Sequence, residues 1–322
     1  MTGLVAAAGL VVMWSSGFVG ARLGTAEAPA DTLLAWRYVV AVAILLAIMV
    51  VRRPRWRRAD LPRQVVLGLL CQSLYLAGVV TGVGLGVPAG VAALIAVLQP
   101  LVVGALSGPV LGELVRVRQW LGLGAGVGGV GLVVAGDAAG GGPPLGYALV
   151  AGGMLALSTG TLLERRWRLA TPLFDSLTIH CLVSAAAFVV PAAVAGRLAP
   201  PGTAGFWCAV AWVVVLSTFG GYGCYLLALR RFGATGASTL LYLTPPTTML
   251  WALLMFGERV GWSGLAGMVV CAGSVWLVLS AKREATWIRG RGRSGSTRRA
   301  ATAFPSSRSP TPTRASAPTR VT

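Results

Sequence analysis

The chain has 322 residues, of which 56% are hydrophobic and only 11% are charged. A soluble domain carries roughly 25% charged residues, so this composition all but excludes an ordinary soluble enzyme. The formal net charge is nevertheless +18, which requires the cations to be confined to particular segments.

Stretches without charged residues predict ten apolar segments, each long enough to cross a bilayer core of about 30 Å as a helix. In chain order they cover residues 3–21, 31–51, 65–84, 89–111, 119–136, 144–163, 174–195, 206–228, 234–256 and 261–281. Their connections are too short to hold a soluble domain. Backbone polar groups in lipid must be satisfied internally, and the alternating segments typical of a β-barrel are missing from the sequence. The predicted fold class is an all-α membrane protein with ten transmembrane helices.

The basic residues predict which way these helices face. Six arginines lie between residues 52 and 63, after the second segment, and the positive-inside rule makes that connection cytoplasmic. With ten helices both termini then lie inside, and 23 of the 27 basic residues fall on the cytoplasmic side, against three in outer connections. We therefore expect a multi-pass protein of the cytoplasmic membrane with both termini in the cytoplasm.

Residues 282–322 differ in kind, because Arg, Ser, Thr, Pro and Ala dominate them and Glu284 is their single acid. Such a segment buries too little apolar surface to fold, which predicts a disordered cytoplasmic tail. Its cations either attract anionic lipid or remain solvated. No aromatic platform for stacking bases accompanies them, so nucleic-acid binding is not expected.

An internal repeat relates the two halves of the chain at a constant offset of 145 residues. Its clearest matches are Leu98-Gln99-Pro100 with Leu243-Thr244-Pro245, and Leu111-Gly112-Glu113 with Phe256-Gly257-Glu258. The repeat predicts two five-helix halves, residues 1–140 and 141–281. Because five is odd, the second half enters the membrane from the opposite side. Inverted repeats imply a site near the midplane between the halves, and alternating access to it.

The motifs that carry a family resemblance are Trp14-Ser15-Ser16-Gly17-Phe18, Arg37, Pro100, Gly112-Glu113, Pro245 and Gly257-Glu258. Together they resemble the EamA-type, ten-helix members of the drug/metabolite transporter superfamily, over residues 1–281. The resemblance implies a transporter of small metabolites, often an exporter of amino acids or toxic compounds. The second half departs from the pattern, because His180 or Cys181 stands where the first half has Arg37.

Two ionisable side chains stand out within the segments, since an intramembrane charge is costly and suggests function by default. Arg37 lies about 9 Å along its helix from Asp31, at 1.5 Å per residue. It is either a gate or anion partner, or a residue that snorkels or pairs with Asp31 or another helix. His180 titrates near neutral pH and either couples protons to transport or is a hydrogen-bonded core residue.

Proline, polar and aromatic residues near the repeat interface are further candidates for a substrate cavity or gate. Pro100 and Pro245 each remove a backbone donor and kink their helix, which frees carbonyls to line a cavity. The remaining candidates are Trp14, Ser15, Ser16, Gln72, Tyr75, Gln99, Thr159, Tyr222, Tyr242 and Thr244. Each of them, taken singly, is also compatible with simple packing.

Glu113 and Glu258 end equivalent helices, where an acid opposes the helix dipole. Helix capping or a bond to another helix therefore explains them better than transport chemistry. Alternate glycines from Gly122 to Gly128 form overlapping small-xxx-small pairs, which predict close helix packing within the chain or with a second copy.

The leading functional hypothesis is a secondary transporter whose partners are a small-molecule substrate and the lipid bilayer. No Walker A pattern is present, so energy comes from an ion gradient, with His180 as the candidate proton carrier, or from the substrate's own gradient. An intramembrane enzyme is disfavoured, because His180 is the only histidine and paired buried acids are lacking. Cysteines scattered singly predict neither cofactor nor metal. A non-transporting scaffold is the remaining alternative, and the sequence predicts no oligomeric state.

Overall fold

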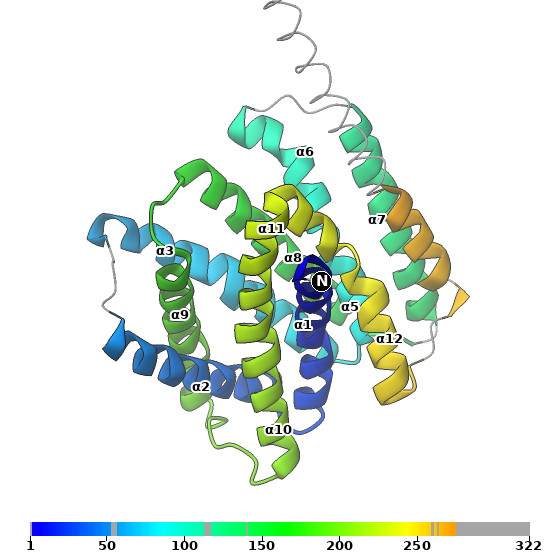
Figure 1. Ribbon diagram of the computed structural model, residues 1–322. Coiled ribbons are helices and arrows are strands. Elements are labelled where there is room, and N and C mark those ends of the chain that lie inside the picture. Colours follow the sequence, from blue (N-terminus) through cyan, green and yellow to red (C-terminus); the bar gives the residue numbers. More distant parts are fainter. Residues whose placement is uncertain are drawn as a thin grey trace, which may run out of the picture. The chain divides into compact units, whose positions relative to one another are not determined.

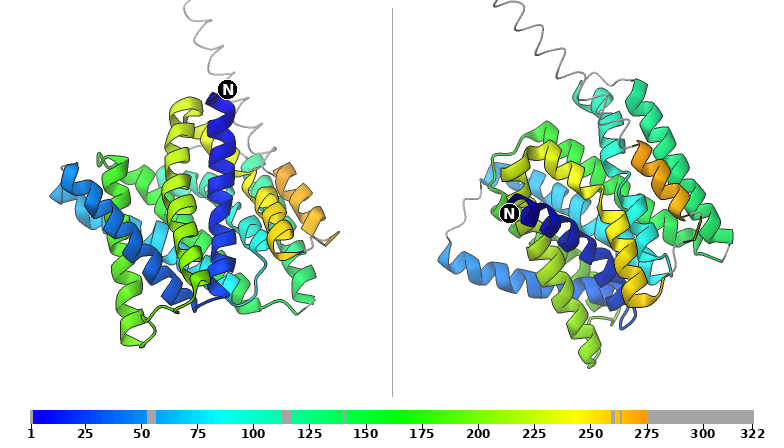
Figure 2. Two further views of the ribbon diagram at one scale, coloured as in Figure 1. Left: turned by 60° about the horizontal axis from the view of Figure 1, so that its bottom comes forward. Right: turned by 45° about the vertical axis from the view of Figure 1, so that its right-hand side comes forward.

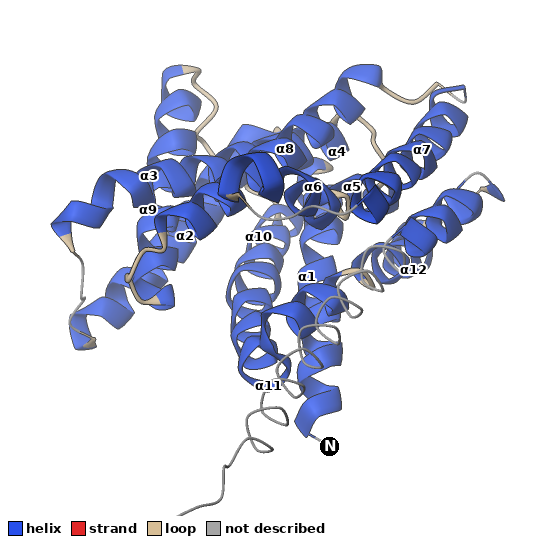
Figure 3. Cartoon of the chain, turned by 90° about the horizontal axis from the view of Figure 1, so that it is seen from above, coloured by secondary structure: helices blue, strands red, loops and turns tan. Residues whose placement is uncertain are grey.

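The computed structural model describes residues 2–274 except 53–56, 113–116, 140, 259–260 and 263. Residues 1–279 form one compact unit, which contains all of them. The described part of the chain consists of helices and short connections without a β-strand (Figure 3), so the predicted all-α class is confirmed there. The predicted tail 282–322 and Glu113 lie outside the described residues.

The first half of the chain supplies five helical spans, some of which contain more than one helix. They are α1 (Thr2–Thr25), α2 (Ala30–Val51), the span formed by α3 (Leu61–Gly68), the π-helical η2 (Leu69–Leu74) and α4 (Tyr75–Gly84), the span formed by α5 (Ala89–Ala96) and α6 (Gln99–Leu111), and α7 (Val117–Ala139). A 3-10 turn, η1 (Arg58–Asp60), precedes α3.

The second half follows a similar order of elements, except that α11 is continuous where α4 and α5 are separate. It contains α8 (Pro144–Trp167), α9 (Leu173–Val194), α10 (Ala204–Trp212), the π-helical η3 (Val213–Gly220), α11 (Gly221–Leu241) and α12 (Thr244–Phe256). A shorter apolar helix follows at Gly264–Ser274, at the start of the predicted tenth span.

Eight helices among the described residues are long and apolar enough to cross a membrane, and they match the first eight predicted spans. The predicted connection at residues 229–233 is wrong, because α11 continues through Arg230 and Arg231 to Leu241. The corresponding break in the first half is made by Gly86, whose φ of 112° favours glycine, and by Pro88. The second half has charge at that point but no proline, and charge alone does not end a helix.

Helix α1 lies at the centre of the bundle, where it packs along α11 and also contacts α4, α5, α10 and α12 (Figures 1 and 2). Helix α2 packs on α9, and α4 packs on α8. The α4–α8 contact is a backbone contact: a Cβ added to Gly153 would lie 2.8 Å from the carbonyl oxygen of Tyr75. Such close approach through glycine is typical of membrane helices.

The predicted proline kinks are full helix breaks. Span 89–111 is interrupted at Val97–Leu98 between α5 and α6, and the chain is interrupted again at Tyr242–Leu243 between α11 and α12. Pro100 and Pro245 each occupy the second position of the new helix, where a proline is tolerated because no backbone donor is needed there.

The two helices that follow these breaks also end alike. Gly112 after α6 has φ 71° and ψ 20°, and Gly257 after α12 has φ 68° and ψ 16°. Both glycines close their helix in the left-handed conformation. Breaks and caps thus recur at the offset of 145 residues that relates the sequence motifs.

Candidate substrate cavity

A cavity of about 150 Å³ lies where α1, α2, η2, α4, α8, α9, η3 and α11 meet. Its lining residues are Trp14, Gly17, Phe18, Arg37, Cys71, Gln72, Tyr75, Leu76, Val79, Leu157, Leu177, Ser217, Thr218 and Tyr222. Five of the residues singled out from the sequence therefore share one cavity, although they come from four separate spans.

A smaller hollow of about 50 Å³ adjoins this cavity and shares Trp14, Phe18, Tyr75 and Leu157 with it. It is bordered at the two helix breaks by Gln99, Pro100 and Thr244. The broken helices of both halves thus face the space next to the cavity.

Two π-helical segments supply much of the polar lining. Segment η2 contributes Cys71 and Gln72, and η3 contributes Ser217 and Thr218. In η3 the Thr218 hydroxyl donates to the carbonyl oxygen of Val213, five residues earlier, at 3.0 Å. A π-turn is rare and is often found at functional sites, because the extra residue re-aims the side chains around it.

The same arrangement occurs in η2 at the repeat offset. The Ser73 hydroxyl donates to the carbonyl oxygen of Gly68 at 3.3 Å, and Gln72 stands 145 residues before Ser217. Sequence reasoning missed Ser217 and Thr218, although extending the repeat from Gln72 would have pointed to them. No sequence signal identified the π-turns themselves.

Arg37 is buried, with 5% of its surface exposed. Its Nη2 donates to the Thr218 hydroxyl at 3.1 Å and to the Ser217 hydroxyl at 3.4 Å. The predicted alternative of a pair with Asp31 is not realised, because Asp31 binds Arg197 at 2.6 Å. Arg37 thus joins α2 to η3 at the wall of the cavity.

His180 lies away from the cavity lining. Its Nε2 is 2.9 Å from Oε1 of Gln64, whose amide nitrogen donates to the Ser176 hydroxyl at 3.1 Å. These bonds link α9 to α3, so His180 belongs to an interhelix polar cluster.

The remaining predicted residues lie around the cavity rather than in it. The buried Ser15 donates to the carbonyl oxygen of Thr244 at 3.3 Å, and Ser16 donates to that of Met13 at 2.6 Å. Thr159 is on an exposed face of α8 and bonds its own helix. Tyr242 and Pro245 border a separate, mostly apolar hollow beside the Gly264–Ser274 helix.

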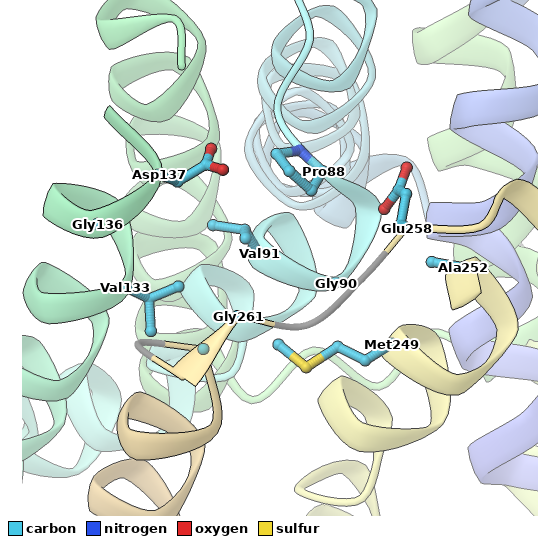
Figure 4. Close-up of a pocket in the computed structure, with 11 residues that line it drawn as sticks. Pro88, Gly90, Val91, Val133, Gly136, Asp137, Met249, Ala252, Glu258 and Gly261 are labelled. Carbon is cyan, nitrogen blue, oxygen red and sulfur yellow. The ribbon is translucent and has the colours of Figure 1, made fainter. Parts of the chain in front are cut away.

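Glu258 and Asp137 face a further hollow of about 260 Å³ (Figure 4). Glu258 accepts a hydrogen bond from the backbone N–H of Ala89, the first residue of α5, and lies 3.6 Å from Nε of Arg22. Asp137 accepts a hydrogen bond from the Tyr147 hydroxyl. Burial raises the pKa of the Glu258 carboxyl, while Arg22 and the Ala89 N–H oppose that rise. Glu258 therefore caps α5 and ties it to the C-terminal end of α1.

Comparison with solved structures supports the same fold. One crystal structure, described only as that of a protein, matches with a TM-score of 0.62 and 20% sequence identity, and the match covers 88% of this chain and 98% of that one. At this identity the likeness concerns the fold alone. No curated protein matches the chain.

The family of the chain follows from a sequence profile that matches it twice, over residues 1–135 and 144–280. The profile describes EamA-like transporters, and it covers nearly all of the helical unit. With eight membrane-length helices among its described residues, the chain is a multi-pass membrane protein that belongs to the EamA-like transporter family, within the drug/metabolite transporter superfamily.

Proposed function

We propose that the protein is a secondary transporter that exports a small metabolite across the cytoplasmic membrane by alternating access through the central cavity. The observation that carries the proposal is that repeat-related residues line the cavity and its adjoining hollow. Gln72 and Ser217 border the first, and Gln99 and Thr244 border the second. A site built from both halves is what a transporter with inverted repeats requires.

Two five-helix halves, residues 1–140 and 141–281, are supported by features that recur at the offset of 145 residues. These are the π-turns, the helix breaks and the left-handed glycine caps. Five spans per half give opposite orientations, and the arginine-rich connections give cytoplasmic termini. The full count of ten spans and the inversion are parts of this proposal.

Polar contacts join the two halves at both ends of the bundle, and two of them lie at the end that we assign to the outside. Arg197 binds Asp31 at 2.6 Å, and the Thr203 hydroxyl donates to Glu27 at 2.8 Å. At the opposite end, which we assign to the cytoplasm, the Gln64 amide nitrogen donates to the Ser176 hydroxyl at 3.1 Å. Alternating access would break one set of end contacts while the other stays closed.

The driving force is proposed to be a proton gradient sensed through His180, because its bonds to Gln64 join helices from both halves. Because the Gln64 amide oxygen only accepts, Nε2 of His180 donates in this bond, and protonation of the ring at Nδ1 would add a charge and a donor between the two helices. The alternative is facilitated diffusion down the substrate gradient. Flux in proteoliposomes with and without a pH gradient separates the two, and loss of the gradient effect in His180→Asn assigns the coupling to this residue.

Export is tested by a growth-inhibition panel of amino acids and toxic compounds, comparing deletion with overexpression, followed by flux measurements on the purified chain. A Cβ on Gly17 would lie 2.7 Å from the Ser217 hydroxyl, whereas a Cβ on Gly152 would meet nothing within 4 Å. We expect Gly17→Leu to block flux and Gly152→Leu to leave it intact. Flux of no compound under any gradient would contradict transport and favour a scaffold.

A further inference from the structure

An open hollow of about 720 Å³ lies at the C-terminal ends of α6 and α8, two helices that pack against each other. It is lined by Val110 and Leu111 at the end of α6 and by Arg165, Arg166 and Arg168 at the end of α8. It shares no lining residue with the central cavity, and no acidic side chain of the described residues lines it. The hollow is therefore basic on one side and apolar on the other.

Two of the three arginines have no partner within the protein. Arg166 and Arg168 are exposed, and neither guanidinium forms an ion pair or a hydrogen bond with the described part of the chain. Arg168 ends α8 with φ 48° and ψ 50°, a left-handed conformation that is usually left to glycine. Guanidinium groups form bidentate, charge-assisted bonds to phosphate, so the hollow is suited to a phosphate ligand.

The length of α8 places these arginines at the membrane surface. The helix has 24 residues, which gives about 36 Å at 1.5 Å per residue, against about 30 Å for the hydrocarbon core. Trp167, over whose ring Arg63 lies at 6.0 Å, belongs to the same last turn, and tryptophan is enriched at membrane interfaces. The arginines of the hollow therefore lie at the level of the lipid phosphates.

Apolar side chains continue from the hollow toward the membrane interior. Leu106 is 36% exposed and lies one turn before Val110 on the same face of α6. Leu155 is 50% exposed and lies three turns before Arg166 on the same face of α8. A ligand with a phosphate in the hollow can thus lay hydrocarbon chains on both helices. The dipole of α8 favours cations at its end, but it does not account for a hollow shared with a second helix.

We propose that this hollow binds the headgroup of an anionic phospholipid of the cytoplasmic leaflet. Arg166 and Arg168 bind the phosphate, and the acyl chains lie along the exposed faces of α6 and α8. Anionic lipids populate that leaflet, and basic pockets between transmembrane helices suit their headgroups. The positive charge of the three arginines disfavours a zwitterionic lipid, whose headgroup also carries a cation. This site is independent of the proposed transport function.

The test compares dioleoylphosphatidylglycerol with dioleoylphosphatidylcholine, which share their acyl chains. Both are added to the full chain in detergent, and the bound lipids are counted by native mass spectrometry. We expect phosphatidylglycerol to bind at least tenfold more tightly. Loss of one cation near the membrane surface weakens binding of an anionic lipid about fivefold. Arg166→Gln combined with Arg168→Gln should therefore lower the affinity for phosphatidylglycerol about 25-fold and leave that for phosphatidylcholine unchanged.

A control variant with the same loss of charge separates a site from general attraction. Arg57 and Arg58 are exposed, lie on the same predicted side of the membrane and do not line the hollow. Arg57→Gln combined with Arg58→Gln should lower the affinity for phosphatidylglycerol less than twofold. All four arginines are exposed, so both double variants should fold.

Three results would overturn the proposal: equal affinity for the two lipids, an unchanged preference in the Arg166 and Arg168 variant, or an equal loss in the control variant. A further arm distinguishes the lipid from a free phosphate ester. Glycerol phosphate, which is the headgroup without acyl chains, should not displace phosphatidylglycerol at the same concentration. Displacement would show that the hollow takes a soluble phosphate, and it would refute the lipid as the ligand.

Discussion

The contact between α4 and α8 depends on a glycine that an alanine cannot replace. Gly153 faces α4, and a Cβ there would lie 2.8 Å from the carbonyl oxygen of Tyr75 and 3.4 Å from Cα of Gly78. The neighbouring Gly152 faces open space, with no heavy atom within 4 Å of its added Cβ. The two glycines therefore form a matched pair in one helix.

We predict opposite effects for Gly153→Ala and Gly152→Ala. Both variants gain the helix propensity of alanine, roughly 1 kcal/mol, but Gly153→Ala must move α4 away by about 0.5 Å to reach normal van der Waals distance. Overpacking of this kind costs about 1–3 kcal/mol. The contact is with backbone, which cannot turn aside as a side chain can.

Thermal unfolding of the purified variants measures this difference. A cost of 1 kcal/mol lowers the Tm by about 2–4 °C for a chain of this size, so Gly153→Ala should melt several degrees below Gly152→Ala. Because Tyr75 lines the cavity, substrate affinity should fall in the same variant. Equal Tm values for the two variants would refute the backbone contact.

Three further predictions concern pH, orientation and a buried hydrogen bond. Because the pKa of Glu258 is raised in the folded protein, folded chains bind its proton more tightly, and its contribution to stability falls as the pH rises through that pKa. The Tm of Glu258→Gln relative to wild type should therefore increase from about pH 4 to about pH 7, and a decrease would contradict the assignment. In a chain without its native cysteines, Gly202→Cys should react with a membrane-impermeant maleimide added outside and Ala170→Cys only after permeabilisation; the reverse labelling would invert the topology. Ser73→Ala should cost about 1–3 kcal/mol in unfolding experiments, because it removes the hydroxyl that lies 2.9 Å from the buried hydroxyl of Ser184, and the double variant with Ser184→Ala should cost less than the sum.

Most of the helical spans could be predicted, because a bilayer demands long apolar runs with internal hydrogen bonds. Boundaries were predicted best where a proline or a glycine changes the backbone, as at Ala89–Leu111. The connection at residues 229–233 was predicted from charge instead, and it is absent. Helix ends are determined by backbone geometry, and side-chain charge gives only orientation.

Close helix packing was predicted less well. The glycines of the fifth span predicted a tight interface, which Gly126 makes with Leu98 and Leu101, whereas Gly124 and Gly128 face open space. Among the described glycines the closest approach to a backbone atom belongs to α4 and α8, between Gly78 and the carbonyl oxygen of Leu149. Small-xxx-small spacing identifies a helix face that can pack closely, and the tertiary arrangement decides which face does.

Arg37 could be located in the sequence from its charge alone, whereas Ser217 and Thr218 could be located only by extending the repeat from Gln72. The repeat relates Ser73 to Thr218, and each hydroxyl bonds a carbonyl five residues earlier. Yet Ser73 contacts the neutral Ser184 on α9, whereas Thr218 contacts the cationic Arg37 on α2. Of these two repeat-related hydroxyl groups, only Thr218 in η3 therefore has a charged partner. The halves agree in backbone and differ in polar content, and Arg37 is the cavity residue at which this difference is greatest.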